Sequence, residues 1–162
     1  MQLAQLNIAE GMADMDAPQM RPFTGRIDAV NALADRAAGF IWRLTDDDAN
    51  IDGALSLRLP GDTKTLVNMS VWDSVEALFG FVYKTAHAKV MTDNRDNFAD
   101  MPKQHMVLWW VEDGHVPNLT EAKDRLDTLR AKGPSPYAFD FNTPFNKAGQ
   151  PIAPSFPKKD CA

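Results

Sequence analysis

Four side chains between residues 68 and 87 are of types that could act together on a small molecule. Asn68 and Trp72 lie four positions apart in an alternating stretch, so in a β-strand both project from one face. Tyr83 and His87 lie four positions apart in a helical pattern, one turn apart beside its apolar stripe. An amide can donate to a substrate oxygen, and an imidazole can take up a proton or ligate haem iron. We therefore predict that these four residues form the catalytic part of a site.

Several of these residues also have a purely structural interpretation, and the sequence leaves both open. Asn68 could hydrogen-bond the backbone at an irregularity of the sheet, and Trp72 could be an ordinary core residue. His87 could form a hydrogen bond that caps a helix end. Arg43 presents a similar choice, because an arginine on a sheet either binds an anion or forms a salt bridge, here across a dimer.

The elements that must position this set follow one another without a loop. Leu66–Trp72 alternates as a strand, with Val67, Met69 and Val71 on its apolar face. Asp73 is expected to cap the next helix, and Glu76 three residues later completes a capping box. Apolar residues then recur at helical spacing, so we expect one helix that extends through His87: Val75, Leu78, Phe79, Val82 and Ala86. His87 would then look into a cleft beside the sheet.

The flanking segments predict an alternating order of strands and helices. Strands are expected at 2–9, 40–44 and 105–111, and helices at about 22–38 and 118–133. Gly39 should end the first of these helices, and Asn118 should cap the last. The resulting order, β-α-β-β-α-β with an extra C-terminal helix, makes an α+β ferredoxin-like fold one option among several.

The fourth predicted strand is apolar on both faces. Met106, Leu108 and Trp110 alternate with Val107, Trp109 and Val111. A half-exposed antiparallel sheet should be polar on one face, so this strand requires cover on both sides. Helices can cover one face, and the sheet of a second copy would cover the other, which predicts a homodimer.

Two segments fall outside this pattern. Residues 45–65 read as an irregular excursion, in which Asp48, Asn50, Asp52 and Gly53 match half of a calcium loop, yet Leu59 stands where a glutamate ligand belongs. We therefore expect a solvated acidic turn there. Residues 134–162 are rich in proline and phenylalanine, so we expect a tail that follows a domain of residues 1–133. Its Phe139–Phe141 piece should dock, with about the last ten residues loose.

Composition excludes several classes of function. The 162 residues carry a net charge of −5 with scattered basic residues, so there is no electrostatic basis for binding nucleic acid. There is no apolar run of about eighteen residues and no basic region followed by an apolar one, so we expect a cytoplasmic protein without a membrane span. The three histidines lie on different elements and Cys161 lies near the end of the chain, so we expect neither a metal site nor a disulfide.

Four stretches carry a resemblance to a known family. They are LAQLN at residues 3–7, GFIWRL at 39–44, LVNMSVWDSVEALFGFVYKTAHAKV at 66–90 and VLWWVEDGHVP at 107–117. Together they resemble the uncharacterised bacterial family called domain of unknown function 3291, in the dimeric α/β-barrel superfamily. The resemblance covers about residues 3–133 and implies a ferredoxin-like fold that pairs into a dimeric α/β barrel.

The same superfamily contains cofactor-free antibiotic-biosynthesis monooxygenases and haem-degrading monooxygenases, and both resemble parts of this chain. Similarity to the first implies that Asn68 bonds a substrate oxygen and that Trp72 bounds the cavity. Similarity to the second implies a haem site with Asn7 on the first strand and His87 as the iron ligand. The helical tryptophan of the haem-degrading enzymes is replaced here, where the chain reads Phe81-Val82-Tyr83.

The predicted function is to bind a small apolar or phenolic molecule in an aromatic-lined pocket between the sheet and the second helix. We expect an oxygenase that needs no cofactor, with His87 as base, and a further set of substrate-contacting residues: Asn7, Trp42, Arg43, Phe79 and Trp110. Haem bound through His87 is the alternative. A non-catalytic ligand-binding or structural dimer is a third possibility.

Overall fold

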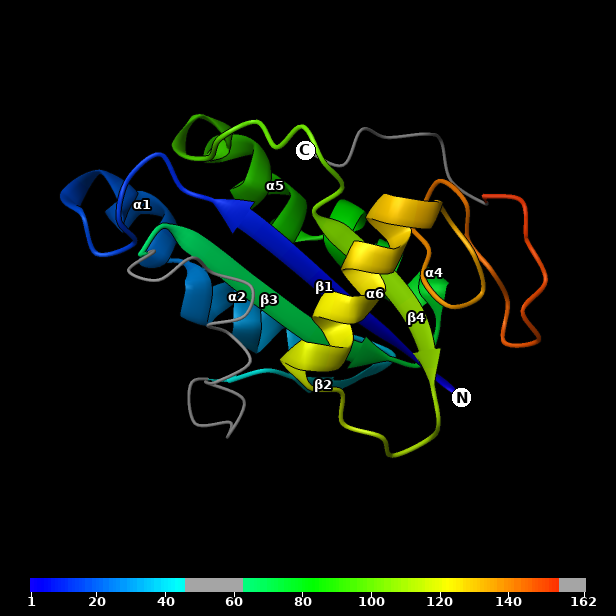
Figure 1. Cartoon of the computed structure of the whole chain (residues 1–162). Helices are drawn as coiled ribbons and strands as arrows, with labels where there is room; N and C mark the ends of the chain where they lie inside the picture. The colour runs from blue at the N-terminus through cyan, green and yellow to red at the C-terminus, as the bar shows by residue number, and fades with distance from the viewer. Residues whose placement is uncertain (46–62, 155–162) are drawn as a thin grey trace.

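The computed structural model describes residues 1–45 and 63–154. Four strands form one antiparallel sheet in the order β2-β3-β1-β4 (Figure 1). They are β1 (Gln2–Glu10), β2 (Phe40–Arg43), β3 (Thr65–Trp72) and β4 (Met106–Val111). The long central strands β1 and β3 pair over eight residues, from Leu3 opposite Trp72 to Glu10 opposite Thr65. This order, with helices after β1 and β3, is the ferredoxin-like arrangement, so the predicted fold is confirmed.

Helices cover both faces of the sheet. On one face lie η1 (Pro18–Met20), α1 (Arg21–Thr24), α2 (Ile27–Ala34), α4 (Val75–Lys84), α5 (Ala86–Asp93) and η2 (Arg95–Asn97). On the other face lies α6 (Leu119–Lys132), which crosses in front of the sheet in Figure 1. No helix of the described residues is both long and apolar enough to cross a bilayer.

Two apolar cores lie on the two sides of the sheet. The α6 side holds alternate residues of β1, β3 and β4 together with four residues of α6: Leu119, Ala122, Leu126 and Leu129. The opposite side holds Leu3, Trp72 and Leu108 with α4 and the tail. Because successive strand residues point to opposite faces, the apolar alternation of each strand supplies both cores.

The two apolar faces of β4 predicted cover by a second copy of the chain, but α6 provides that cover. Leu126 and Leu129, 0% and 1% exposed, pack in the same core as Val107, Trp109 and Val111. The cover expected from a second sheet therefore comes from the same chain. A homodimer itself stays a prediction, but it needs a different surface from the one that α6 occupies.

The first predicted helix, at 22–38, is in fact two shorter helices. α1 ends at Thr24, α2 begins at Ile27, and Gly25 between them is a poor helix former. α2 stops at Ala34, short of Gly39, whose φ of 81° is accessible mainly to glycine. A Cβ at Gly39 would lie 2.4 Å from Asp73 Oδ1, so the glycine also permits close approach of the β3–α4 junction.

The second predicted helix is also divided. Thr85 has extended backbone angles, φ −113° and ψ −176°, and separates α4 from α5. Its hydroxyl donates to the Phe81 carbonyl (2.6 Å) and accepts from the His87 amide (3.2 Å), so it ends one helix and caps the next. The cap of α4 is Ser74, which accepts from the Ala77 amide (3.2 Å), one position after the predicted Asp73.

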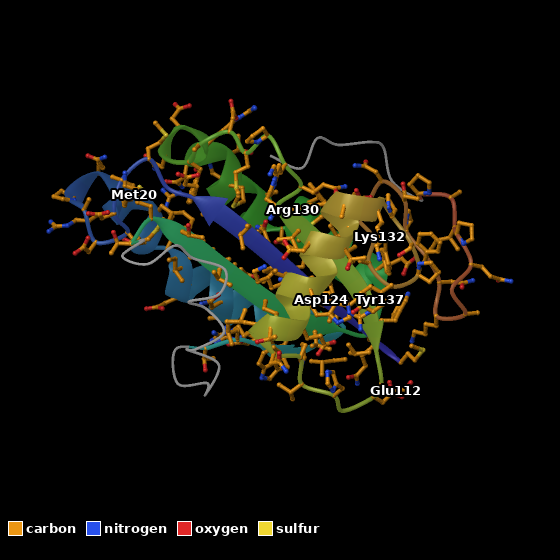
Figure 2. The ribbon with its side chains drawn as sticks, viewed as in Figure 1. Met20, Glu112, Asp124, Arg130, Lys132 and Tyr137 are labelled. Carbon is orange, nitrogen blue, oxygen red and sulfur yellow. The ribbon has the colours of Figure 1, made fainter. Side chains whose placement is uncertain are left out.

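The tail docks on β4, as predicted for its Phe-Asp-Phe piece. The backbone of Phe139 exchanges two hydrogen bonds with Leu108 (2.8 and 2.9 Å), and Phe139 is fully buried. Ahead of it, Tyr137 lies against α6 near Asp124 (Figure 2). The Arg125 guanidinium stacks 3.7 Å from the Tyr137 ring centroid, and the Tyr137 hydroxyl donates to Asp124. The predicted acidic turn, with Asp48, Asn50, Asp52 and Gly53, lies outside the described residues, as do Leu59 and Cys161.

Candidate functional site

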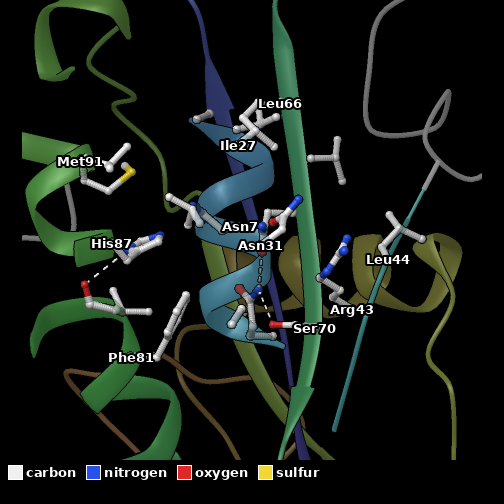
Figure 3. A pocket seen from close by; sticks show the side chains of 18 of the residues that line it. Asn7, Ile27, Asn31, Arg43, Leu44, Leu66, Ser70, Phe81, His87 and Met91 are labelled. Carbon is white, nitrogen blue, oxygen red and sulfur yellow. Dashed lines mark hydrogen bonds between the residues drawn. The ribbon is translucent and has the colours of Figure 1, made fainter. Parts of the chain in front are cut away.

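A cavity of about 580 Å³ lies between the sheet and the helices α2, α4 and α5 (Figure 3). Its floor is the helix-facing side of β1, β2 and β3, and it is mostly polar: Gln5, Asn7, Arg43, Asn68, Ser70 and Trp72. Its walls are mostly apolar and come largely from the helices: Ile27, Val30, Phe81, Val82, Val90 and Met91. A polar floor beneath apolar walls suits a small organic molecule that carries a few oxygen or nitrogen atoms on one side.

The floor is organised by the buried side chain of Gln5. Its amide nitrogen donates to Asn68 Oδ1 (2.7 Å) and to Ser70 Oγ (2.9 Å), and Gln5 is 6% exposed. The Trp72 indole nitrogen also donates to Ser70 Oγ (2.8 Å). Strand pairing explains this convergence, because Gln5 lies opposite Ser70, and Asn7 lies opposite Asn68.

His87 lies on the helical wall, at the first turn of α5. Its Nδ1 is 3.2 Å from the Val82 carbonyl, which can only accept, so Nδ1 carries the proton and Nε2 has the free lone pair. Burial lowers the pKa of His87, an effect that the hydrogen bond to Val82 partly offsets. His87 is therefore neutral at pH 7, and in Figure 3 its ring projects from α5 into the cavity. Among the described residues, Nε2 has no hydrogen-bond partner.

Arg43 and Trp42 take opposite faces of β2, as their alternation predicts. Arg43 lines the cavity, and Trp42 packs against the core beneath α6. The Arg43 Nε donates to Asp35 Oδ1 (2.9 Å), so the ion pair is formed within one chain rather than across a dimer. Since Asp35 balances its charge, Arg43 adds little net positive potential to the cavity.

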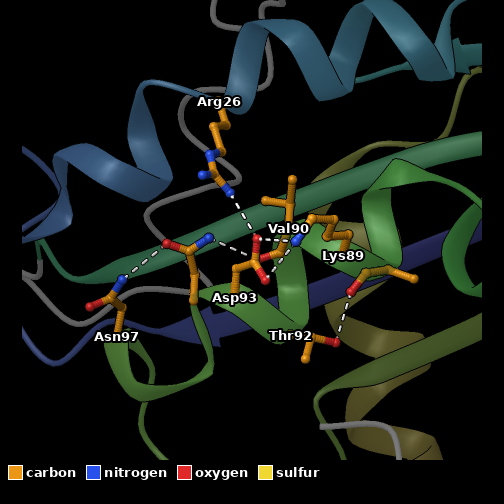
Figure 4. Close-up of polar contacts among 8 residues, drawn as sticks. Arg26, Lys89, Val90, Thr92, Asp93 and Asn97 are labelled. Carbon is orange, nitrogen blue, oxygen red and sulfur yellow. Dashed lines mark hydrogen bonds and ion pairs between the residues drawn. The ribbon is translucent and has the colours of Figure 1, made fainter.

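The end of the cavity between α2 and α5 carries polar links. Asp93, two residues after the lining residue Met91, pairs with Arg26 (3.3 Å) at the start of α2 and with Lys89 (3.0 Å) (Figure 4). The hydrogen bond from Lys89 is the main cause that lowers the pKa of the exposed Asp93 carboxyl. Close by, the rings of Phe23 and Phe98 meet edge to face, 4.8 Å between centroids. These contacts tie the wall that holds His87 to the wall formed by α2.

The structure brings together five of the nine predicted site residues: Asn7, Arg43, Asn68, Trp72 and His87. The other four do not line this cavity. Phe79 and Tyr83 face the tail and pack on Phe141, at 5.5 and 5.8 Å between ring centroids. Because Thr85 interrupts the helix, Tyr83 and His87 do not share one helical face. Trp110 donates to the Phe145 carbonyl (2.8 Å), so it contacts the tail, and Trp42 lies on the other side of the sheet.

Sequence reasoning missed Gln5 and Ser70, although a signal for each was present. Gln5 alternates with Asn7, and Ser70 lies between Asn68 and Trp72 on the same face of its strand. The sequence does not give the register of β1 on β3. That register places Gln5 opposite Ser70, within reach of both Ser70 and Asn68.

The cavity has a candidate axial ligand for haem iron, His87, but its arginine is not free to bind a haem propionate. His87 could ligate iron through Nε2, with Nδ1 held by a backbone carbonyl as in many metal-bound histidines. Arg43, the only arginine of the lining among residues 1–45 and 63–154, is already paired with Asp35, so an incoming propionate would compete for it. In the described part of the chain, no group of three His, Cys, Asp or Glu side chains is arranged to hold a metal ion.

Comparison with known proteins identifies a family. The model of the family described as Domain of unknown function (DUF3291) matches residues 2–154. A solved structure from Chloroflexus aurantiacus J-10-fl, provisionally described as an antibiotic biosynthesis monooxygenase, is 16% identical with a TM-score of 0.42 over 72% of this chain and 98% of its own. At that level the likeness says nothing about ligand or reaction. No curated protein sequence matches. From the family match, which spans nearly the whole chain, we conclude that this protein belongs to the DUF3291 family.

Proposed function

We propose that the cavity binds a small apolar or phenolic molecule and that His87 takes a proton from its hydroxyl group. The observation that supports this most directly is the pairing of a neutral imidazole on an apolar wall with a polar floor below it. A neutral Nε2 can accept a phenolic proton, and the apolar wall holds the ring. Asn68 can stabilise the resulting oxyanion, since its Oδ1 is engaged by Gln5 and its Nδ2 remains as a donor.

If the protein is an enzyme, its reaction is oxygenation without a cofactor. Loss of the phenolic proton makes the ring electron-rich enough to react with molecular oxygen. One oxygen atom then replaces a ring hydrogen as a new carbonyl, and the other leaves as water, so that a phenol and O₂ become a quinone and H₂O. The chain contributes orientation, proton uptake at His87 and hydrogen bonds from the floor.

Replacement of His87 by alanine tests the proposal. Native mass spectrometry of protein purified from its own host would identify a retained ligand, and oxygen consumption with that compound would measure turnover. We expect His87→Ala to lower turnover by about 10² or more, the usual contribution of a general base. His115→Ala is the matched control, because His115 lies outside the cavity lining and pairs with Glu121 of α6 (2.8 Å). Equal turnover in His87→Ala and wild type would end the proposal.

His87→Ala also tests the alternative that the protein binds haem. The observation that favours this alternative is that His87 Nδ1 is held by the Val82 carbonyl, which leaves Nε2 available to ligate iron. Haemin added to the wild-type protein would give a shifted Soret band if His87 ligates iron, and the His87→Ala protein would lack it. A band that persists in the variant, or no band in either protein, counts against haem.

A further inference from the structure

The hydrogen bonds of the cavity floor leave Ser70 and Asn68 as donors. Ser70 Oγ accepts from both Gln5 Nε2 (2.9 Å) and Trp72 Nε1 (2.8 Å). A serine oxygen has two lone pairs, so both are used and its hydroxyl proton remains to donate. Within residues 1–45 and 63–154 this proton has no acceptor, although Ser70 is only 5% exposed and lines the cavity.

Asn68 is also left as a hydrogen-bond donor, because its acceptor oxygen is already used. Its Oδ1 accepts from Gln5 Nε2 at 2.7 Å, which leaves the two hydrogens of Nδ2 for a ligand. Both oxygens lie within hydrogen-bonding distance of one Gln5 nitrogen, so the two donors are close neighbours on one face of β3. Of the two, Ser70 is buried, and a buried donor without a partner is unfavourable, so the floor favours a ligand that presents an acceptor oxygen to it.

The opposite wall has the opposite polarity. His87 Nε2 is an acceptor, because Nδ1 donates to the Val82 carbonyl. A ligand that spans the cavity should therefore donate at the helical wall and accept at the sheet. A compound with only one kind of polar group satisfies one side alone.

We infer that the cavity takes a conjugated hydroxy-carbonyl compound, with its hydroxyl facing His87 and its carbonyl oxygen facing Ser70 and Asn68. This inference rests on the proposed function and adds to it the class of ligand and a role for Ser70. When the hydroxyl proton moves to His87 Nε2, conjugation moves the negative charge onto the carbonyl oxygen. The neutral pair becomes a ligand anion and an imidazolium, and the two floor donors then stabilise the anion. Ser70 is thus a ligand-binding residue rather than a proton acceptor.

Three bicyclic probes of similar size test the inference by absorbance titration. 6-Hydroxy-2-naphthaldehyde has both groups, 2-naphthol lacks the carbonyl, and 6-methoxy-2-naphthaldehyde lacks the acidic proton. We expect the first to bind about tenfold more tightly than either of the others, the effect of one hydrogen bond to a charged group. Its bound spectrum should show the long-wavelength band of the phenolate at a pH where the free compound is neutral.

Variants separate the roles of the residues. Ser70→Ala and Asn68→Ala should each weaken binding of the hydroxyaldehyde about tenfold, and should affect 2-naphthol less, because 2-naphthol has no carbonyl oxygen for the floor donors. Asn142→Ala, an exposed asparagine outside the cavity lining, is the control. Because Ser70→Ala removes an acceptor from two buried donors and could unfold the chain, Asn68→Ala provides a second, independent test at an exposed position.

The outcomes distinguish this inference from the proposed function. Equal affinities for all three probes, unchanged in Ser70→Ala and Asn68→Ala, would overturn the inference and leave a ligand-binding cavity. Tighter binding of 2-naphthol than of the hydroxyaldehyde would also overturn the inference and leave a ligand-binding cavity. If no probe binds at all, both the inference and the proposed function are wrong.

Discussion

The properties of His87 arise from two features of its surroundings. The Val82 carbonyl, 3.2 Å from Nδ1, selects the tautomer, and burial among the cavity walls disfavours the charged form. An imidazole that is neutral near pH 7 can serve as a base without first losing a proton. The same burial makes protonation of His87 unfavourable for the folded state, which can be measured.

The first prediction concerns stability in mild acid. The pKa of His87 in the folded protein is below its ordinary value of 6.5, so on acidification the unfolded chain binds a proton that the folded chain does not. This contribution to stability is complete above pH about 6.5 and is lost as the pH falls through the folded-state pKa. Urea unfolding between about pH 5 and about pH 8 should show a smaller acid loss in His87→Gln than in wild type.

NMR gives an independent check on the same prediction. The Hε1 resonance of His87, assigned by its absence in His87→Gln, should titrate with a midpoint below pH 6.5. A midpoint above this value would mean that a nearby negative charge outweighs burial and that His87 is charged in the folded state.

Residue-level reasoning from the sequence predicts part of the cavity lining because strand alternation is a local property. Asn68 and Trp72 share a face by spacing alone, and Arg43 and Trp42 must lie on opposite faces. Alternation does not say which face becomes the cavity, so it cannot show that Trp42 lies in the other core. The positions of Phe79 and Trp110 cannot be predicted for another reason, since the tail that they contact has no regular pattern.

At the scale of elements, the interruption between α4 and α5 positions His87. The local sequence predicts an uninterrupted helix, because a threonine inside a helix costs only about half a kcal/mol by propensity. Thr85 instead bonds backbone groups on both sides of the interruption, Phe81 O and His87 N. Such competition between a side chain and the helix depends on packing, so propensity and periodicity could not reveal it.

The second prediction is that the Thr85 hydroxyl holds α5 in place. Thr85→Ala removes the cap and should lower the free energy of unfolding by about 1 kcal/mol, as for other N-caps. It should also weaken ligand binding, because the first turn of α5 carries His87. Thr85→Ser keeps the hydroxyl and should behave like wild type in thermal unfolding and in titrations with 2-naphthol. An alanine variant that matches wild type in both assays would mean that packing alone holds α5.

At the scale of the whole molecule, α6 determines which surfaces remain for a partner. Its predicted cap and end are both observed, with Asn118 accepting from the Glu121 amide (2.9 Å) and Gly133 as the C-cap. The sequence therefore predicted where α6 begins and ends, but not which face of the sheet it covers. That choice depends on long-range packing, so the local pattern of β4 alone points to a second copy as the cover for its apolar face.

The third prediction tests whether α6 covers its face of the sheet in solution or whether the sheet of a second copy does so. Leu126 is fully buried on the face of α6 that packs on the sheet, so Leu126→Ala should lower the free energy of unfolding by about 2 to 5 kcal/mol through loss of contacts and the cavity left behind. If α6 provides the cover, this loss appears without a change in molar mass by light scattering. A dimer held by another surface would keep its mass in this variant. A dimer joined through the sheets would need α6 displaced, so its thermal midpoint would rise with concentration and Leu126→Ala would cost little.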